Sequence, residues 1–277
     1  MPKKELLEKI LNTKIEKLDY LSSTQAGDIY VADDKFVIKT GKNGSGLLPL
    51  EAKMLQFLSE NSLPVPKVYY FDEDILIMEY IKKSNTCDEK NQIRAAKSLA
   101  LLHHVKRNIF GFEYDTAIGP LLQPNPKLKS WIEFYGRHRV LEFAERAYKK
   151  GFLSEKEIER IKKFCKSLRS FLIEPEFSSL LHGDLWQGNI IYSNSGPVFI
   201  DPAVYFGHYE VEIAFTTMFG TFDKIFYDVY SEILPLEKEF WSQRRDIYLL
   251  YPYLVHVNIY GRSYWEGVDR ILKKFGF

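Results

Sequence analysis

Cysteine is scarce in this sequence, and long apolar runs are missing. Only Cys87 and Cys165 occur among the 277 residues, and they lie far apart in the chain. A disulfide framework or a zinc site would need more cysteines or closer spacing, so we expect two reduced thiols. A helix that spans a bilayer needs about 20 consecutive apolar residues, and no run approaches that length. We therefore expect neither a disulfide-stapled domain nor a membrane partner.

An excess of charge of one sign is also missing. The chain has 38 Lys and Arg residues against 37 Asp and Glu residues, which gives a formal net charge of +1. A nucleic-acid-binding domain usually carries a strongly basic face, so we expect no nucleic-acid partner. Residues Met1–Glu5 lead into a charged amphipathic stretch rather than the apolar core of a signal peptide, so we expect a cytoplasmic protein. For the assembly state we expect a monomer or a weak homodimer.

Apolar and aromatic residues, in contrast, are plentiful. Hydrophobic residues make up 45% of the chain and aromatic residues 15%, which is enough for a sizeable core. The length suits two modest domains, or two lobes around a cleft. In the first part of the chain the pattern predicts helices over 6–11 and 50–60 and strands over 29–32, 35–40, 68–71 and 75–81.

Beyond residue 82 the pattern becomes mainly helical. It predicts helices over 88–104, 129–149 and 155–171, short strands over 178–181, 190–192 and 198–200, and mostly helix from 210 to 277. We therefore expect an α+β fold of two lobes. The smaller, β-rich lobe covers 1–81, the larger helical lobe covers 82–277, and residues 78–81 join them.

The most informative segment runs from Leu180 to Asn189. Asp184 is followed five positions later by Asn189, and Asp201 comes after a further β-like run. Transfer of a γ-phosphoryl group needs a carboxylate that accepts the proton of the attacking hydroxyl, and oxygen ligands that hold Mg²⁺ against the phosphates. We therefore expect Asp184 to be the general base and Asn189 and Asp201 to bind magnesium, in a protein-kinase-like fold. The alternative is that Asp184 and Asn189 are ordinary turn formers and that Asp201 is the start of a loop.

Two residues of the first lobe complete this set. Lys39 ends a predicted strand, at the position where a kinase lysine grips the α- and β-phosphates of ATP. Glu51 lies on the apolar face of the following helix, and a carboxylate there needs a cationic partner. We expect the two side chains to form an ion pair. The alternative for Lys39 is a solvated lysine at the end of a strand.

The segment that joins the lobes is a candidate for adenine binding. A hinge can offer an alternating acceptor and donor to the edge of a base, so we expect the backbone of Glu79, Tyr80 and Ile81 to hold the adenine. The alternative is a plain linker. The turn over 22–28 is a weak candidate for a phosphate-covering loop, because it has a single glycine. The loop over 40–46 lacks the Gly-Lys-Ser/Thr ending of a Walker motif and is interpreted as a connector.

The same motifs carry a resemblance to a known family. His182-Gly183-Asp184-Leu185-Trp186-x-Gly188-Asn189 resembles the signature of the fructosamine kinase (ketosamine-3-kinase) family. Further matches lie over 196–208, which includes Asp201-Pro202-Ala203-Val204-Tyr205, and over 110–112, 118–125 and 131–139. The resemblance covers nearly the whole chain. The bare His-Gly-Asp-x4-Asn core is shared with the wider aminoglycoside-phosphotransferase-like superfamily.

This resemblance implies an activity. Family members use ATP, with Mg²⁺, to phosphorylate a sugar-derived ketoamine on its third-carbon hydroxyl, which makes the adduct labile and frees the amine. The substrate would be a small-molecule ketosamine or a glycated protein. Trp186 follows the expected base by two residues, and its indole can face a sugar and attract a cationic amine. The alternative is a core tryptophan that supports the loop.

Two other functions stay open. The first is a kinase of another small hydroxyl compound, such as an aminoglycoside, choline or homoserine. Trp186 and the segment Gln123-Pro124-Asn125, interpreted as substrate-side, argue against it. The second is a nucleotide-binding regulator without activity, and the presence of the expected catalytic residues argues against that.

The sequence also departs from the family pattern in two places. The turn over 25–28 has no cysteine, and Glu212 stands where Asp is expected.

Overall fold

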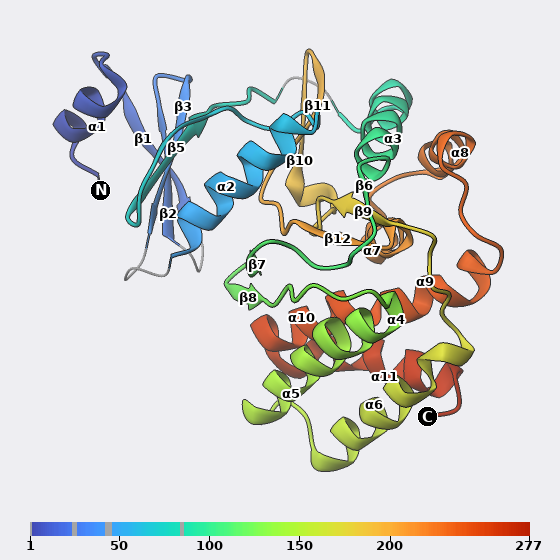
Figure 1. Ribbon diagram of the computed structural model, residues 1–277. Helices are drawn as coiled ribbons and strands as arrows, with labels where there is room; N and C mark the ends of the chain where they lie inside the picture. Colours follow the sequence, from blue (N-terminus) through green and yellow to red (C-terminus); the bar gives the residue numbers. More distant parts are fainter. Residues whose placement is uncertain (1, 24–26, 42–45, 84–85) are drawn as a thin grey trace.

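The N-terminal part of the chain forms a five-stranded antiparallel sheet with one long helix against it (Figure 1). The structure is a computed structural model and describes residues 2–23, 27–41, 46–83 and 86–277. The strands follow the order β1-β2-β3-β5-β4. Their bounds are β1 (Leu18–Ser23), β2 (Gly27–Ala32), β3 (Phe36–Gly41), β4 (Val68–Phe71) and β5 (Ile75–Glu79). A short helix, α1 (Lys4–Leu11), precedes them.

Local sequence explains the tight hairpin between β2 and β3. Asp33 and Asp34 both have a φ of 51°, in the left-handed region that Asp tolerates. The Lys35 N–H donates to the Ala32 carbonyl at 2.9 Å and closes the turn. The two strands then pair in register from Ala32 and Phe36 to Gly27 and Gly41. A Cβ added to Gly27 would lie 1.6 Å from the carbonyl oxygen of Thr40, so only glycine fits this close approach.

Helix α2 (Leu47–Glu60) links the sheet to the rest of the molecule. It begins three residues earlier than expected, because Pro49 fits the first turn, where its missing N–H is not needed. Met54 and Leu58 belong to the large core of the C-terminal part rather than to the sheet. The backbone N–H of Val204 also contacts the sulfur of Met54 at 3.3 Å. The helix therefore places its inner face, which carries Glu51, against both parts.

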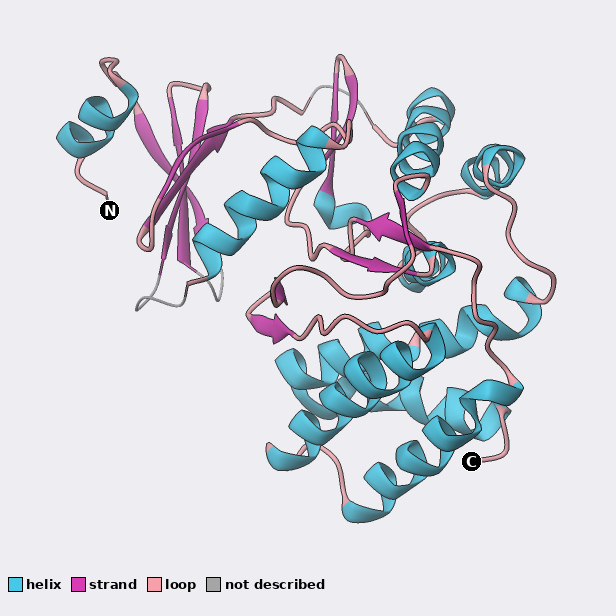
Figure 2. Cartoon of the chain, in the orientation of Figure 1, coloured by secondary structure: helices cyan, strands magenta, loops and turns pink. Residues whose placement is uncertain are grey.

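The remaining chain is largely helical (Figure 2). The helices are α3 (Glu89–His103), α4 (Trp131–Phe134), α5 (Glu142–Lys149), α6 (Glu155–Ser167), α7 (Tyr209–Met218), α8 (Lys224–Ile233), α9 (Arg245–Tyr248), α10 (Leu250–Tyr260) and α11 (Trp265–Lys274), with π-helical segments η1 (Tyr135–Leu141) and η4 (Phe240–Arg244). Short strands lie among them: β6 (Lys106–Arg107), β9 (Ser178–Leu181) and β12 (Tyr205–Gly207) form one sheet, and β7 (Thr116–Ile118) with β8 (Leu121–Gln123) and β10 (Ile190–Ser193) with β11 (Gly196–Phe199) form hairpins.

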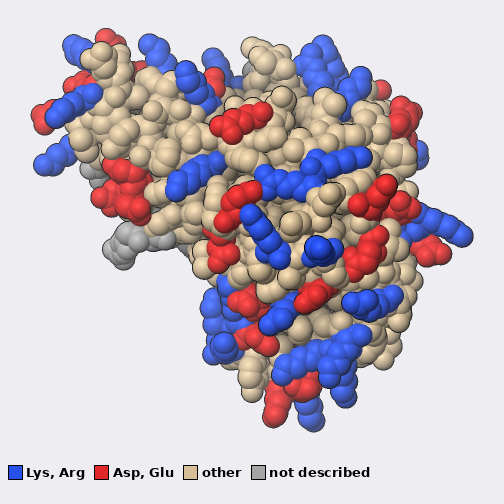
Figure 3. Space-filling view, in the orientation of Figure 1, with Lys and Arg blue, Asp and Glu red and all other residues tan. Residues whose placement is uncertain are grey.

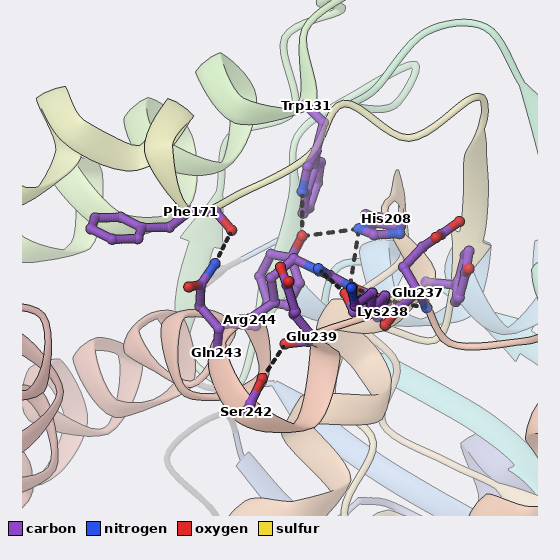
Figure 4. A network of polar contacts seen from close by, with 12 residues as sticks. Trp131, Phe171, His208, Glu237, Lys238, Glu239, Ser242, Gln243 and Arg244 are labelled. Atoms are coloured by element: carbon purple, nitrogen blue, oxygen red, sulfur yellow. Dashed lines mark hydrogen bonds and ion pairs between the residues drawn. The ribbon is translucent and has the colours of Figure 1, made fainter.

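A buried polar network fixes the start of α7 (Figure 4). The Arg244 guanidinium donates to both carboxylate oxygens of Glu210, at 2.7 and 2.8 Å, and both side chains are buried. Close by, the indole N–H of Trp131 donates to the Tyr248 hydroxyl at 3.0 Å, and that hydroxyl lies 2.9 Å from His208 Nδ1. Burial lowers the pKa of His208 to about 3, so its ring is neutral. The bidentate ion pair anchors the helix that reaches the site described below.

The sequence prediction is correct for the α+β class and for most elements. It is wrong in treating 129–149 as one regular helix, because the π-helical η1 interrupts it. It does not predict β1 as a separate strand, and it misses β6, β7, β8 and β12, which are only two or three residues long. We propose that the lobe boundary lies at 81–82, as expected, since the five-stranded sheet has its own apolar clusters.

No helix among the described residues is long and apolar enough to cross a membrane. On the face in Figure 3, basic and acidic side chains are interspersed.

Candidate active site

The segment after β9 brings the expected base and the expected amide ligand together. Gly183 has a φ of +90°, and a Cβ there would lie 1.9 Å from the carbonyl oxygen of Ala203, so the chain can turn here only with glycine. Asp184 follows this turn. The Asn189 Nδ2 donates to the Asp184 backbone oxygen at 2.8 Å and to Asp184 Oδ2 at 3.0 Å. These two bonds fix the base and orient the amide of Asn189.

The β10–β11 hairpin carries the chain back to the same place. The N–H of Ile200 donates to the carbonyl of Asn189 at 3.0 Å, and the N–H of Ala203 donates to the carbonyl of His182 at 2.8 Å. Asp201 lies between these two anchors, with a φ of +52°. The two loops are therefore bonded on both sides of Asp201, and its carboxylate is held beside that of Asp184.

Lys39 connects the sheet to this pair of loops. Its ammonium lies 2.6 Å from Glu51 Oε1 and also contacts Asp201 Oδ1. The side chains of Lys39 and Glu51 are only 14% and 16% exposed. Burial alone would lower the pKa of Lys39, but the carboxylates of Asp201 and Glu51 outweigh it and raise that pKa. The expected contact between Lys39 and Glu51 is therefore present, and it extends to Asp201.

Two carboxylates share this one lysine, and their titrations differ. Burial raises the pKa of Glu51, although the Lys39 ammonium opposes the shift. Burial also acts to raise the pKa of Asp201, but there the attraction of Lys39 is larger and the pKa is lowered. Asp201 is thus the carboxylate that stays ionised, as a metal ligand must.

The environment of Asp184 suits a proton acceptor. Burial raises its pKa to about 7, the hydrogen bond from Asn189 opposes the shift, and the charges of Asp201 and Glu212 add to it. A general base is most effective when its pKa lies near the working pH.

These residues line one cleft of about 350 Å³ between the two parts of the chain. Its walls come from β3, α2, the hairpin β7–β8, the two loops and α10. The lining side chains include Lys39, Glu51, Met54, Ile118, Pro120, Asp184, Trp186, Asn189, Asp201, His256 and Tyr260. A compound that enters here meets the Asp184 carboxylate, the Lys39 ammonium and the oxygens of Asn189 and Asp201 together.

Trp186 lies at the surface of this cleft and is 37% exposed. Its ring covers Gly188, where an added Cβ would lie 2.3 Å from the indole. The centroid of the Phe219 ring is 5.6 Å away. Its exposure argues against the alternative of a core tryptophan.

The oxygen donors fit a magnesium ion. Asn189 donates through its nitrogen to Asp184, which leaves the amide oxygen as a neutral ligand, and Asp201 supplies a carboxylate. No cluster of three or more His, Cys, Asp or Glu residues that could hold a metal occurs among the described residues. A cation held here would need further oxygen ligands, such as phosphates or water.

In the hinge over 79–81, two of the three backbone N–H groups already have partners within the protein. The Glu79 N–H donates to the carbonyl of Lys67 at 2.8 Å, and the Tyr80 N–H donates to that of Lys35 at 2.9 Å. Both amides are thus used by the sheet, which leaves the Ile81 N–H as the candidate donor to a base. None of the three residues lines the cleft described above. Residues 24–26 of the expected phosphate-covering turn lie outside the described part of the chain.

Glu212 is a residue whose role the sequence did not reveal. Its buried carboxylate accepts the backbone N–H groups of His182 and Gly183, at 3.0 and 2.5 Å, immediately before Asp184. His103 Nε2 lies 2.9 Å from the same carboxylate. Burial would raise the pKa of Glu212, but the hydrogen bond and charge of His103 outweigh it and lower the pKa. The available signal was a glutamate inside the apolar run Val211–Phe215.

The interpretation of Gln123-Pro124-Asn125 as substrate-side is wrong. Gln123 and Asn125 are buried and do not line the cleft. Their side chains instead bind backbone and side-chain groups beneath the Asp201 loop. The segment therefore offers no argument about the substrate.

Comparison with known proteins finds relatives that match nearly the whole chain. A family profile described as Fructosamine kinase matches residues 3–275. A probable ketoamine kinase of Enterococcus faecium is 37% identical over 220 residues, which is 76% of each chain. The chloroplastic protein-ribulosamine 3-kinase of Arabidopsis thaliana is 35% identical over 253 residues, which is 87% of this chain and 76% of that protein.

Solved structures give the same result for the fold. A candidate fructosamine-3-kinase from Thermobifida fusca aligns over 98% of this chain and 96% of its own, with a TM-score of 0.89 and 27% identity. An aminoglycoside phosphotransferase in complex with streptomycin and ATP aligns over 97% of this chain and 94% of its own, with a TM-score of 0.66 and 19% identity. The second match shows a shared kinase-like fold alone. The profile match and the curated relatives show that the chain belongs to the fructosamine kinase family.

Proposed function

We propose that this protein transfers the γ-phosphoryl group of ATP to the 3-hydroxyl of ketosamines, that is, of ribulosamine or fructosamine adducts. The observation that carries the proposal is the convergence of Asp184, Asn189, Asp201 and Lys39 in one cleft, beside the exposed indole of Trp186. The names of the curated relatives support the acceptor class.

Each residue has a defined task in this reaction. The Asp184 carboxylate accepts the proton of the sugar hydroxyl while that oxygen forms a bond to the γ-phosphorus and the bond to ADP breaks. Lys39, held by Glu51, compensates phosphate charge. Asn189 and Asp201 would hold Mg²⁺, which supplies charge neutralisation and orientation of the phosphates. Glu212 acts through the backbone, since it keeps the two amides before Asp184 in place.

The two substrates are assigned to different places: the adenine to the hinge, outside the lining of the cleft, and the sugar to the cleft itself. We assign the adenine to the carbonyl of Glu79 and the N–H of Ile81, with Tyr80 between them as part of the hinge. We assign the sugar to Trp186, whose flat apolar face suits the C–H face of a sugar and attracts a cationic amine. The phosphorylated adduct would then release the amine, so the biological result is deglycation. We propose that the protein works in the cytoplasm, on small ketosamines or glycated proteins.

The test is a measurement of ATP consumption with a panel of acceptors. The panel contains ribulosamines, fructosamines, an aminoglycoside and choline, each with and without Mg²⁺, and phosphorus NMR locates the phosphate on the product. We expect turnover with ketosamines, phosphate on the 3-oxygen, and a loss of at least about 10²-fold in Asp184→Ala. Turnover confined to the aminoglycoside or choline, or a phosphate on another oxygen, would overturn the proposal.

A further inference from the structure

Two buried carbonyl groups, of the second and third residues after Asp201, accept hydrogen bonds from the hairpin β7–β8. Gln123 Nε2 donates to the carbonyl of Ala203 at 3.0 Å. The Thr116 hydroxyl donates to the carbonyl of Val204 at 3.0 Å. All four residues are buried. Because an unpaired buried carbonyl is costly, these bonds hold the backbone of the Asp201 loop in one place.

The orientation of both donors is fixed by further partners. The Tyr251 hydroxyl donates to Gln123 Oε1, which turns the amide nitrogen toward Ala203. The hydroxyl oxygen of Thr116 accepts from Gln123 Nε2 and from Asn125 Nδ2, both at 2.8 Å. Since both acceptor positions of the Thr116 oxygen are then filled, its hydrogen must point at Val204.

A buried cation completes the network. Arg139 donates to Asn125 Oδ1 at 2.6 Å, which leaves the Asn125 nitrogen facing Thr116. The guanidinium lies over the Tyr205 ring, 4.0 Å from its centroid. Tyr205 is the residue after Val204, so the same segment is held from a third side.

Asp201 needs such support for a physical reason. Its φ of +52° is in the left-handed region, which a residue other than glycine adopts at a cost and keeps only where its surroundings determine it. The backbone of Ala203 links the two loops: its N–H donates to the carbonyl of His182, and its carbonyl oxygen lies against Gly183. The opposite end of the hairpin, at Gly119 and Pro120, borders the cleft.

We propose that Gln123 and Thr116 are positioning residues, which hold the Asp201 loop through the Ala203 and Val204 carbonyls and so keep the Asp201 carboxylate where it can bind Mg²⁺. The role rests on the proposed phosphotransferase site, in which Asp201 is a metal ligand, and not on the identity of the acceptor. Neither side chain touches substrate or metal.

The test compares two buried glutamines that each take part in three hydrogen bonds. Gln92 is buried like Gln123, and its side chain binds Cys87 and Asp223, away from the cleft lining. We would prepare Gln123→Met and the matched control Gln92→Met and measure ADP affinity by calorimetry, with Mg²⁺ and in EDTA. In Gln123→Met, we expect affinity with Mg²⁺ to fall by about tenfold and affinity in EDTA to change little. In Gln92→Met, we expect both affinities to stay near those of the parent protein.

A second pair of variants separates positioning from folding. Thr116→Val removes the hydroxyl that binds Val204, and Thr116→Ser keeps it. We expect the Mg²⁺-dependent loss and faster amide hydrogen exchange over residues 200–205 in Thr116→Val, and recovery of both in Thr116→Ser. This pair decides the question if Gln123→Met fails to fold.

Two results would overturn the inference. One is parental Mg²⁺-dependent ADP affinity in both Gln123→Met and Thr116→Val, and the other is an equal loss in Gln92→Met. A parent protein that phosphorylates no ketosamine would refute the proposed acceptor and leave this test intact, because the test uses ADP alone.

Discussion

Replacing Asp184 by Asn should make the nucleotide-free protein more stable at pH 8 while it removes most of the activity. Burial, with help from the charges of Asp201 and Glu212, raises the pKa of Asp184 to about 7. In the unfolded chain the same carboxyl ionises near pH 4. Between these two pH values the unfolded state loses a proton and the folded state keeps it, so stability falls as the pH rises. The side-chain amide of the Asp184→Asn variant does not titrate, so the variant avoids this loss.

The size of the effect follows from the shift. The pKa rises from an ordinary value of 3.8 to about 7, and each pKa unit corresponds to about 1.4 kcal/mol. Ionisation of Asp184 can therefore lower the free energy of unfolding above pH 7 by at most about 4 kcal/mol. The Asp184 side chain is partly exposed, so solvent screening reduces the effect of its charge. We therefore expect Asp184→Asn to raise the free energy of unfolding above pH 7 by about 1–2 kcal/mol. The new amide oxygen can still accept the hydrogen bond from Asn189, so little is lost in exchange.

Urea unfolding between about pH 4.5 and pH 8.5, in EDTA, measures this difference. The gain of Asp184→Asn over the parent protein should grow from about pH 4 to pH 7 and then level off. Asp72→Asn is a control of opposite sign: burial would raise the pKa of Asp72, but hydrogen bonds from Tyr70, Asp74 and Ile75 outweigh it and lower the pKa. That variant should lose stability at neutral pH. An Asp184→Asn protein that is less stable than its parent at pH 8, or equally shifted at every pH, would refute the reasoning.

The sequence could place the side chains of the proposed catalytic set together because they are close in sequence or fixed by helical periodicity. Asp184 and Asn189 lie in one loop, and a short hairpin returns the chain to Asp201, so spacing alone places the three together. The helical period places Glu51 on an apolar face, where an unpaired carboxylate would be costly. A cationic partner was therefore needed, and Lys39 was the candidate. The structure shows the contact at 2.6 Å. The further contact of Lys39 with Asp201 joins residues 162 positions apart, and no local pattern carries it.

The hydrogen bonds from Gln123 and Thr116 to the Asp201 loop could not be predicted from local sequence patterns. Gln123 and Thr116 reach their partners across 80 and 88 residues, from strands of three residues that are too short to show a period. Polar side chains are mostly exposed, so the burial of Gln123 and Asn125 is not expected from their residue types. The buried carbonyls of Ala203 and Val204 need hydrogen-bond donors. Only the three-dimensional structure of the loop shows that these carbonyls are buried. The role of Glu212 was equally hidden from the sequence, because its carboxylate accepts hydrogen bonds from backbone amides 29 and 30 positions away.

Three further changes test the remaining assignments. In a double-mutant cycle, Lys39→Met and Glu51→Gln should couple in Mg·ATP affinity by about 0.5–3 kcal/mol, whereas strictly additive losses would show that the pair does not act together. Glu212→Gln should lower kcat more than either KM, because it weakens the hold on the amides before Asp184; an unchanged kcat would count against that role. Trp186→Ala should raise KM for the ketosamine and leave KM for ATP nearly unchanged, because the indole lines the cleft and we assign the sugar to it. At 37% exposure the ring is only partly packed, so the loss of stability should stay well below the about 3–5 kcal/mol of a buried tryptophan. A variant that melts far earlier but keeps its ketosamine KM would show that Trp186 supports the loop and does not bind the sugar.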